Sequence, residues 1–190
     1  MTSSALAQSQ AAAPLVNPKE QDIVDALAGR AGGLQGKSFR RTADPDADSH
    51  ACLKALAPTV AQKTSQRNLV VVPYAAEGAP TLNLVVNFAS NSDRLLISSH
   101  EALTRLANAL KSPQLEAAAV AVAGHTDAVG PLRTNLQLSC ARAIAVRNYL
   151  LAKGVEPERL GAYGFGPTRP LEVAVAASAV NRRVEIRRAN

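Results

Sequence analysis

The chain has 190 residues, which suit one ordinary domain with additional chain, or two very small domains, and exclude a large multidomain assembly. Its hydrophobic fraction of 47% consists mainly of small side chains, because alanine is about a fifth of the chain, aromatic residues are 3% and tryptophan is absent. No apolar stretch approaches the ~18 to 20 residues of a membrane-spanning helix, so the sequence predicts no transmembrane segment.

The net charge of +6 is uneven along the chain. Residues 1–80 hold eight Lys and Arg against seven Asp and Glu, and residues 81–190 hold 13 against eight, so most of the excess lies in the second half. The basic residues form no long lysine-rich run, and few aromatic rings are available to stack on bases. Nucleic acid is therefore not an expected partner, whereas an acidic partner of another kind remains open.

The first part of the chain shows only short predicted elements. Residues 1–18 contain Ala, Gln, Ser and Pro without periodicity, which is typical of a disordered leader. Within this leader, Ser4 to Gln8 has the form of a signal-peptidase site, so we expect the sequence to begin just before the cleavage point of an exported protein. Three elements are predicted after the leader: a helix at 22–29, a helix at 49–57 and a strand at 68–72.

The main domain boundary is predicted at the chain-breaking residues 77–80, Glu-Gly-Ala-Pro. Residues 19–78 then form a small, partly ordered N-terminal segment of unknown role, and residues 79–190 form the main domain.

Beyond this boundary, strand and helix signals alternate regularly. Apolar residues at every second position predict a strand over 82–88. Ser98 and Glu101 form a capping box, which predicts a helix from there to about Ser112. Further periodic segments complete the order β-α-β-α-β-β: a strand at 117–123, a long helix at 135–153, and strands at 160–164 and 183–187.

This order predicts an α+β fold, a two-layer sandwich in which helices pack on a mixed sheet. Two strands joined by a single helix are expected to be parallel, with a right-handed crossover. In the last predicted strand, arginines alternate with Val184 and Ile186, which favours a solvated edge strand over an anion-binding patch.

The long predicted helix carries a charge in the middle of its apolar stripe. At 100° per residue, Arg142 lies close to Val146 around the helix axis, whereas Arg147 points away and is interpreted as solvated. A buried guanidinium needs a partner, and helical side chains lean toward the N-terminus of their helix, which directs Arg142 to the loop that holds Asp127. The two residues form either an internal salt bridge or a clamp for an amino acid, whose carboxylate would bind the guanidinium and whose ammonium would bind the aspartate.

Three motifs also resemble a known family: Gly124-His125-Thr126-Asp127-x-x-Gly130, Asn135-x-x-Leu138-Ser139-x-x-Arg142-Ala143 and Asn181-Arg182-Arg183-Val184-Glu185. In this order they resemble the OmpA C-terminal-like family, which includes the Pal lipoproteins and the MotB stator proteins, over residues 79–190. The resemblance implies a non-enzymatic periplasmic domain of a Gram-negative cell that binds peptidoglycan non-covalently through the diaminopimelate of the stem peptide. The family's diaminopimelate-binding Asp and Arg fall on Asp127 and Arg142. Such a domain would tether the cell envelope to the wall, in association with the outer membrane.

One position departs from the family. Where the family shows an aromatic-Asp-x-x-Ser pattern, this chain has Phe88-Ala89-Ser90-Asn91-Ser92, with Ala89 in place of the Asp. Asn91 is therefore a candidate for a supporting contact to the ligand, and Thr126 and Asn135 are candidates that hold the loop or contact the ligand. An alternative function is a structural envelope adaptor whose residues 19–78 bind a protein partner.

The remaining chemistry-bearing residues favour neither catalysis nor a cofactor. His125 lacks a second ligand at metal-binding spacing, and Ser139 lacks the nucleophile-elbow pattern, so no metal site, cofactor or hydrolase triad is expected. Cys52 and Cys140 form no CxxC motif. They form either a disulfide, if the compartment is oxidising, or two small buried thiols.

Overall fold

A computed structural model of the chain describes residues 13–29, 50–52, 72–75, 78–175 and 177–190. The helices, 3₁₀ turns and strands lie in the following order: α1 Glu20–Ala28, β1 Thr81–Leu84, η2 Ile97–Ser99, α3 His100–Lys111, β2 Val120–His125, α4 Leu132–Ala152, η3 Pro157–Arg159, β3 Leu160–Gly166, η4 Ala179–Asn181 and β4 Val184–Arg188. From β1 onward the order is β-α-β-α-β-β, and the α+β class is confirmed. Among these residues, no helix has both the length and the apolar character needed to cross a membrane.

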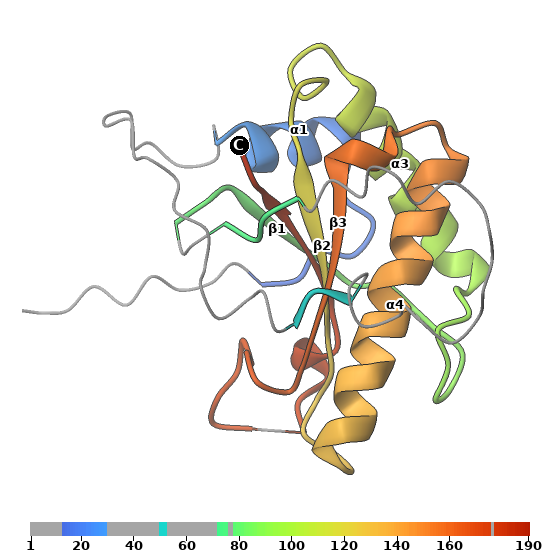
Figure 1. The fold of residues 1–190 in the computed structure, drawn as a ribbon, viewed down its shortest axis with the longest axis vertical. Coiled ribbons are helices and arrows are strands. Elements are labelled where there is room, and N and C mark those ends of the chain that lie inside the picture. Colours follow the sequence, from blue (N-terminus) through green and yellow to red (C-terminus); the bar gives the residue numbers. More distant parts are fainter. Residues whose placement is uncertain (1–12, 30–49, 53–71, 76–77, 176) are drawn as a thin grey trace, which may run out of the picture.

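The four strands form one mixed sheet in the order β1-β4-β2-β3. Strands β2 and β3 are parallel and are joined by α4, as expected for a single-helix crossover. Strand β4 is antiparallel to both β1 and β2 and lies between them. Helices α3 and α4 cover one face of the sheet (Figure 1).

Two glycines allow α4 to lie unusually close to this sheet. A Cβ atom on Gly124 in β2 would lie 2.2 Å from the carbonyl oxygen of Ser139, and one on Gly164 in β3 would lie 2.6 Å from the backbone nitrogen of Cys140. Both contacts are far inside van der Waals distance, so only glycine fits at either position. Because α4 lies so close to the sheet, the space between them is small, and the small side chains of an alanine-rich chain can fill it.

The described parts of the N-terminal half pack against the main domain. Leu15 pairs in parallel with Leu84 at one edge of the sheet, and Ala51 pairs with Tyr163 at the other edge. Cys52 is disulfide-bonded to Cys140 on α4, with a Cα–Cα distance of 5.4 Å, which decides between the two alternatives for the cysteines. The opposite face of the sheet holds a small core cluster that includes side chains from this half: Ala51, Tyr74, Ala121, Ala123, Tyr163 and Phe165.

These contacts bear on the predicted organisation of the first half. The predicted helix at 22–29 is confirmed as α1, which packs against α3. The disordered leader predicted for 1–18 is wrong for its last residues, because Leu15 donates to and accepts from the backbone of the β1 segment. Residues 1–12, and most of the elements predicted at 49–57 and 68–72, lie outside the described residues. The boundary between 78 and 79 stays a prediction.

Two details of the predicted second half are wrong. The last strand is not an edge strand, because β4 lies centrally. On the face away from the helices, Arg187 pairs with Glu185 and donates to the carbonyl of Ala75, whereas Arg188 donates to the carbonyl of Leu27 in α1. The capping box is absent from the described helix α3, which starts at His100 after the 3₁₀ turn η2. Ser98 accepts a hydrogen bond from the side chain of Asn87, and Glu101 pairs with Arg105, so both are engaged elsewhere.

Candidate functional site

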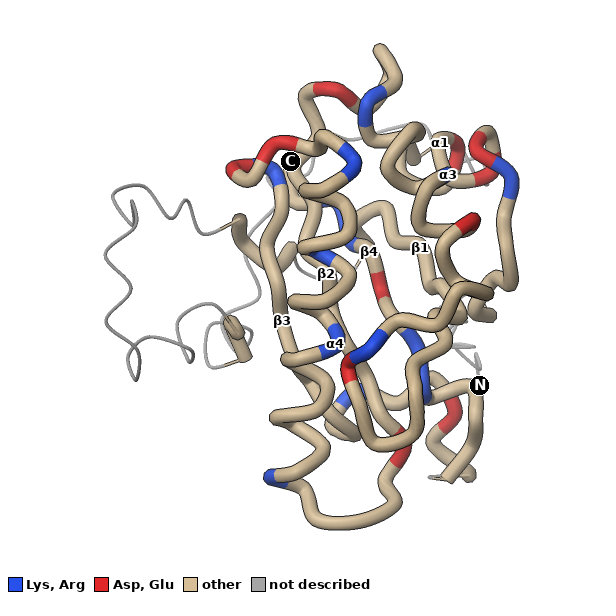
Figure 2. The backbone as a smooth tube through the Cα atoms, turned by 90° about the vertical axis from the view of Figure 1, so that its right-hand side faces the viewer, with Lys and Arg blue, Asp and Glu red and all other residues tan. Residues whose placement is uncertain are grey.

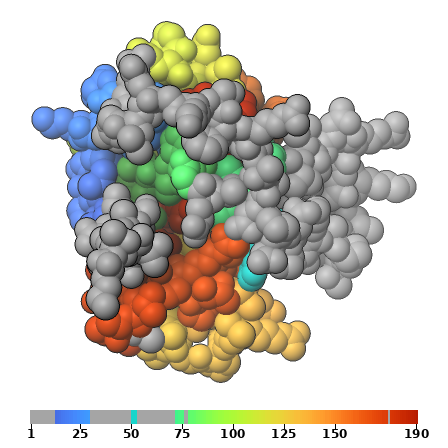
Figure 3. Space-filling view, turned by 90° about the vertical axis from the view of Figure 1, so that its left-hand side faces the viewer, coloured from blue at the N-terminus to red at the C-terminus, as the bar shows by residue number. Residues whose placement is uncertain are grey.

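The predicted site residues lie at one end of the sheet, where β2 ends and β4 begins. Because the two strands are antiparallel neighbours, the residues just after β2 lie beside those just before β4. The backbone pairing continues past the start of β4, since the backbone nitrogen of His125 donates to the carbonyl of Arg183 over 3.0 Å. Figure 3 shows the orange-red chain that leads into β4 beside the yellow-orange start of α4 at this end of the molecule.

Asp127 has a different partner from the predicted one. Its Oδ2 accepts a hydrogen bond from Nη1 of Arg182 over 2.7 Å, in an ion pair whose arginine side chain is 51% exposed. Its Oδ1 accepts from the backbone nitrogen of Val129 over 3.2 Å, which holds the carboxylate at the start of the loop. Asn135, buried at the start of α4, donates to the carbonyl of Val129 over 2.9 Å and so holds the same loop.

Arg142 is held against the chain that follows β1. Its Nε donates to the carbonyl of Ser92 over 3.1 Å, and its guanidinium lies 4.9 Å from the ring centroid of Phe88. Within the described part of the chain, neither terminal NH₂ group of Arg142 has a hydrogen-bond acceptor. Ser92 thus holds one edge of the guanidinium and Phe88 holds one face. The terminal NH₂ groups on its other edge remain available as donors.

The charges around Arg142 act on each other. Burial lowers the pKa of Arg142, and nearby Arg182 lowers it further, whereas Asp127 and Asp93 raise it. Arginine remains protonated at neutral pH despite such shifts. The site therefore presents two cations and two carboxylates on four separate segments of the chain.

The turn between β1 and α3 is a small hairpin. Phe88 pairs with Leu95, and the backbone nitrogen of Ala89 donates to the carbonyl of Arg94 over 2.9 Å. Asn91 lies exposed at its tip with φ of 46°, a left-handed conformation that asparagine tolerates better than most residues. Ala89 brings no carboxylate to the turn, but Asp93 does.

Thr126 and His125 occupy opposite faces of the sheet. Thr126 is 3% exposed, and its hydroxyl has no hydrogen-bond partner among the described residues, although it adjoins Asp127. His125 stacks on Phe165, with ring centroids 5.6 Å apart, and burial lowers its pKa to about 4. A neutral, buried histidine is a structural residue at this position.

Other residues singled out in the sequence support the structure. Ser139 is fully buried, and its Oγ accepts from the backbone nitrogen of Gly166 over 2.9 Å, so it is not an exposed nucleophile. Arg147 is not solvated as predicted, because its Nε donates to the carbonyl of Leu160 over 2.8 Å. The buried stripe of α4 runs through Ser139, Ala143 and Val146, so it is rotated about the helix axis from the predicted stripe, toward Arg147. The described residues contain no group of three or more His, Cys, Asp or Glu placed to hold a metal ion.

Sequence reasoning missed Arg182 as a site residue. The available signal was its position just before a strand whose antiparallel neighbour leads into Asp127, but that neighbour relation is not visible in the sequence. The adjacent Asn181 is 1% exposed and bonds the backbone of Leu171, Glu172 and Val175, which holds the loop before Arg182 in place.

Comparison with known proteins identifies the class. The OmpA family matches residues 87–183, which is more than half of the 190 residues, and the chain belongs to this family. It is 47% identical to outer membrane porin F of Pseudomonas fluorescens over 74 residues, which are 38% of this chain and 23% of that protein.

Two further relatives match longer stretches. Outer membrane protein P5 of Haemophilus influenzae is 33% identical over 129 residues, which are 62% of this chain and 36% of that protein. Peptidoglycan-binding protein ArfA of Mycobacterium tuberculosis is 34% identical over 103 residues, which are 53% of this chain and 31% of that protein. The chain thus spans only 23% to 36% of the length of these relatives.

Solved structures agree on the fold. A MotB-like protein from Desulfovibrio vulgaris superposes with a TM-score of 0.51 at 28% identity, covering 60% of this chain and 78% of that one. The OmpA-like domain of FopA1 from Francisella tularensis gives a TM-score of 0.50 at 26% identity, covering 58% and 77%.

Proposed function

We propose that this chain is a non-enzymatic module that binds peptidoglycan non-covalently, through the diaminopimelate of the stem peptide, and so tethers the cell envelope to the wall. Membership of the OmpA family supports peptidoglycan as the ligand, as does the similarity to ArfA, whose name describes it as peptidoglycan-binding. Because the chain spans a minor part of its curated relatives, their activities as whole proteins are not transferred to it.

The observation that carries the proposal is the half-buried Arg142 with its unused terminal donors. Phe88 and Ser92 orient the guanidinium in advance, so a ligand carboxylate gains two parallel hydrogen bonds without the entropic cost of ordering the side chain. One end of diaminopimelate, when free, carries both a carboxylate and an ammonium group. The ammonium group then binds Asp127, and the buried hydroxyl of Thr126 supplies a further polar group beside it.

The expected affinity suits a tether. Two or three charge-assisted hydrogen bonds at ~1.5 to 3 kcal/mol each correspond to millimolar to micromolar dissociation constants for one stem peptide. The wall repeats the ligand many times, so the effective concentration is high and weak single sites still hold. The basic residues are interspersed with acidic ones along the described backbone (Figure 2), so the excess charge attracts the carboxylates of the wall only diffusely.

The proposed location is the periplasm, in association with the outer membrane. The Cys52–Cys140 disulfide supports an oxidising compartment, because cytosolic thiols are kept reduced.

Co-sedimentation with insoluble meso-diaminopimelate peptidoglycan tests the function. Arg142→Gln should weaken binding about tenfold or more, because it removes a charge-assisted bidentate contact. Arg147→Gln is the matched control, since Arg147 lies on the same helix and also donates its Nε to a backbone carbonyl. Failure of the wild type to pellet, or equal pelleting by both variants, would exclude the proposal. Release of soluble muropeptides would show that the protein is an enzyme instead.

The adaptor alternative, in which residues 19–78 bind a protein partner, stays a prediction. Deleting these residues is a poor test, because it removes α1 from the core and leaves Cys140 without its disulfide partner. Substitutions at exposed positions of α1, such as Glu20 and Gln21, separate partner binding from folding more cleanly.

A further inference from the structure

We propose that Arg182 is a second carboxylate-binding residue, which occupies Asp127 in the free protein and exchanges that contact for the carboxylate of the ligand. This inference rests on the proposed function and concerns the same site. In the exchange, the ligand's ammonium takes the place of Arg182 on Oδ2 of Asp127. The released guanidinium then joins Arg142 in binding the carboxylate of the same amino-acid group.

The contacts of Arg182 suit a group that moves. Within the described part of the chain, the hydrogen-bond acceptor of its side chain is Asp127 alone, reached through Nη1. Its side chain is 51% exposed, so the pair lies in solvent-screened surroundings where ion pairs contribute little to folding. The neighbouring Arg183, in contrast, is 4% exposed and donates to Asn83 and to the carbonyl of Arg169.

Asp127 does not depend on Arg182 for its position. The backbone nitrogen of Val129 donates to its Oδ1, and Asn135 holds that loop from the start of α4. When Arg182 moves away, Oδ2 is left as an oriented acceptor for an ammonium group. The carboxylate is thus arranged to receive a cation, and Arg182 fills that place in the absence of ligand.

The electrostatics favour an anion between the two arginines. Burial is the main cause of the lowered pKa of Arg142, and repulsion from nearby Arg182 lowers it further. A carboxylate between two guanidinium groups removes this repulsion and gains hydrogen bonds to donors that are unused in the free protein. An amide in its place has no charge and offers one acceptor oxygen instead of two.

The consequence is selectivity for the charged form of the ligand. A diaminopimelate whose second amino-acid group is free should bind, whereas the same residue with a carboxamide there should bind poorly. Sites built around polar groups reject analogues that leave those groups unpaired. Arg182 would therefore let the protein distinguish unmodified from amidated wall.

Two synthetic stem tripeptides test this: L-Ala-γ-D-Glu-meso-diaminopimelate with the free carboxylate of that group, and the same peptide with a carboxamide there. Their dissociation constants are measured by calorimetry on the full chain. The wild type should prefer the free carboxylate by about a hundredfold, and Arg182→Gln should reduce this preference about tenfold. Arg182→Lys should restore part of it, because the charge is kept and the planar pair of donors is lost.

The control variant is Arg105→Gln, since Arg105 is also a partly exposed arginine paired with a carboxylate, on α3. It should leave the preference unchanged. If Arg182→Gln weakens both peptides by the same factor, Arg182 only positions Asp127 and the inference is wrong. The inference is also wrong if the variant changes neither constant. If the wild type binds neither peptide, the proposed function fails as well, which distinguishes that failure from the other two.

Discussion

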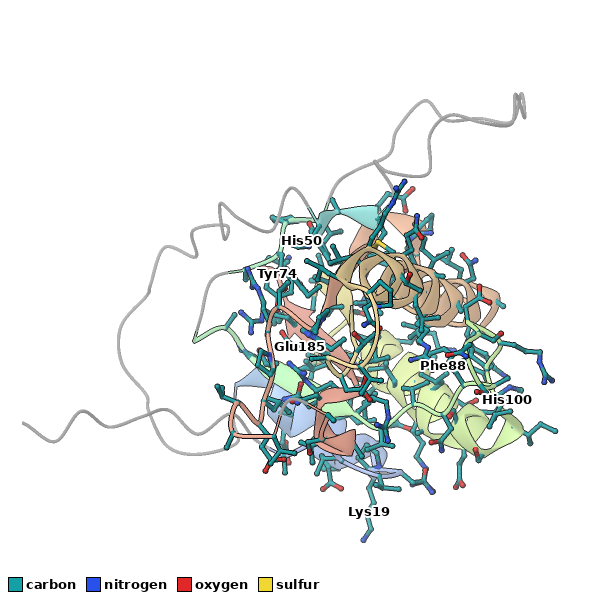
Figure 4. The ribbon with its side chains drawn as sticks, turned by 90° about the horizontal axis from the view of Figure 1, so that it is seen from below. Lys19, His50, Tyr74, Phe88, His100 and Glu185 are labelled. Carbon is teal, nitrogen blue, oxygen red and sulfur yellow. A yellow bond between two sulfur atoms is a disulfide. The ribbon has the colours of Figure 1, made fainter. Side chains whose placement is uncertain are left out.

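Two clusters of carboxylate and arginine lie at nearly the same point of the chain and differ in almost every other respect. The open cluster, Asp127 with Arg142 and Arg182, lies just before the start of β4, and the closed cluster, Glu185 with Arg183 and Arg187, lies along the first residues of the strand. The side chain of Arg182 is 51% exposed, whereas that of Glu185 is 5% exposed. Figure 4 shows Tyr74 and Glu185 together on the side of the molecule away from Phe88, which lies by Arg142.

In the closed cluster the groups bind each other and leave little for a ligand. Tyr74 donates to Oε1 of Glu185 over 2.5 Å, and Nε of Arg187 donates to the same oxygen over 2.8 Å. Arg187 also lies 4.6 Å from the ring centroid of Tyr74. Burial raises the pKa of Glu185, but contacts from His125, Arg187 and Tyr74 outweigh it, so the net pKa is well below the usual range.

The difference teaches that residue type alone does not mark a binding site. Both clusters combine a carboxylate with two arginines near a strand end. What separates them is whether another part of the chain covers the charges and uses their donors. Residues 72–75 do this for Glu185, whereas the segment against Arg142 uses only its Nε, and its two terminal NH₂ groups have no acceptor in the described part of the chain.

The largest expected effect is on stability, from removal of the buried carboxylate. Glu185→Ala should lower the free energy of unfolding by about 3 to 5 kcal/mol, because it leaves Arg183 and Arg187 buried without their counter-charge. Asp127→Ala should lower it by at most about 1 kcal/mol, because that ion pair is partly exposed. Urea denaturation at pH 7 measures both. Equal losses would mean that the two clusters do not differ as described.

The disulfide should come next. Replacing Cys52 and Cys140 by serine should cost about 2 to 4 kcal/mol, because the bond closes a loop between residues 88 apart in sequence and restricts the unfolded chain. Denaturation of the double variant, compared with the wild type under reducing and oxidising conditions, checks the value. Peptidoglycan binding of the folded variant should persist. Its loss would show that the disulfide between Cys52 and Cys140 affects the open cluster as well as stability.

A smaller effect is expected on the pH dependence of stability. The pKa of His125 is about 4 in the folded protein and about 6.5 when unfolded, so the unfolded chain binds more protons between these values. The contribution of His125 is fully present above about pH 6.5 and is lost as the pH falls toward 4, by about 2 to 3 kcal/mol in all.

Thermal or urea unfolding from pH 7 down to 4.5 measures this slope before most carboxylates titrate. His125→Asn should flatten the slope in that window. If the pH dependence of stability in His125→Asn is the same as in the wild type, His125 is not a neutral, buried histidine beside Glu185.

Much of the fold was predictable because its signals are local. Apolar periodicity located β2, α4 and β3 within a few residues, and their order limits the ways they can be connected. The boundaries were less accurate, since β1 ends at Leu84 and α4 begins at Leu132. The residues at which helices and strands begin and end depend on turns such as the one that follows β1. Groups in that turn contact residues distant in sequence, which local patterns do not show.

The site was predictable in part for the same reason. Arg142 is conspicuous as a charge beside an apolar stripe, and Asp127 lies in a loop of small and polar residues, so each is visible within its own segment. Their actual partners, Ser92 and Arg182, lie far away in sequence, and no local pattern links them.

By itself, therefore, the sequence determined the order of the elements, the class of fold and two of the charges of the site, because these depend on periodicity and residue type within short segments. The tertiary structure decided the rest. Only the insertion of β4 between β1 and β2 buries Glu185 and brings Arg182 onto Asp127, since strand pairing depends on contacts between distant segments. The packing of α4 beside the turn after β1 leaves only the terminal donors of Arg142 unused. The tertiary structure thus separates a charge that stabilises the protein from one that remains available to a ligand.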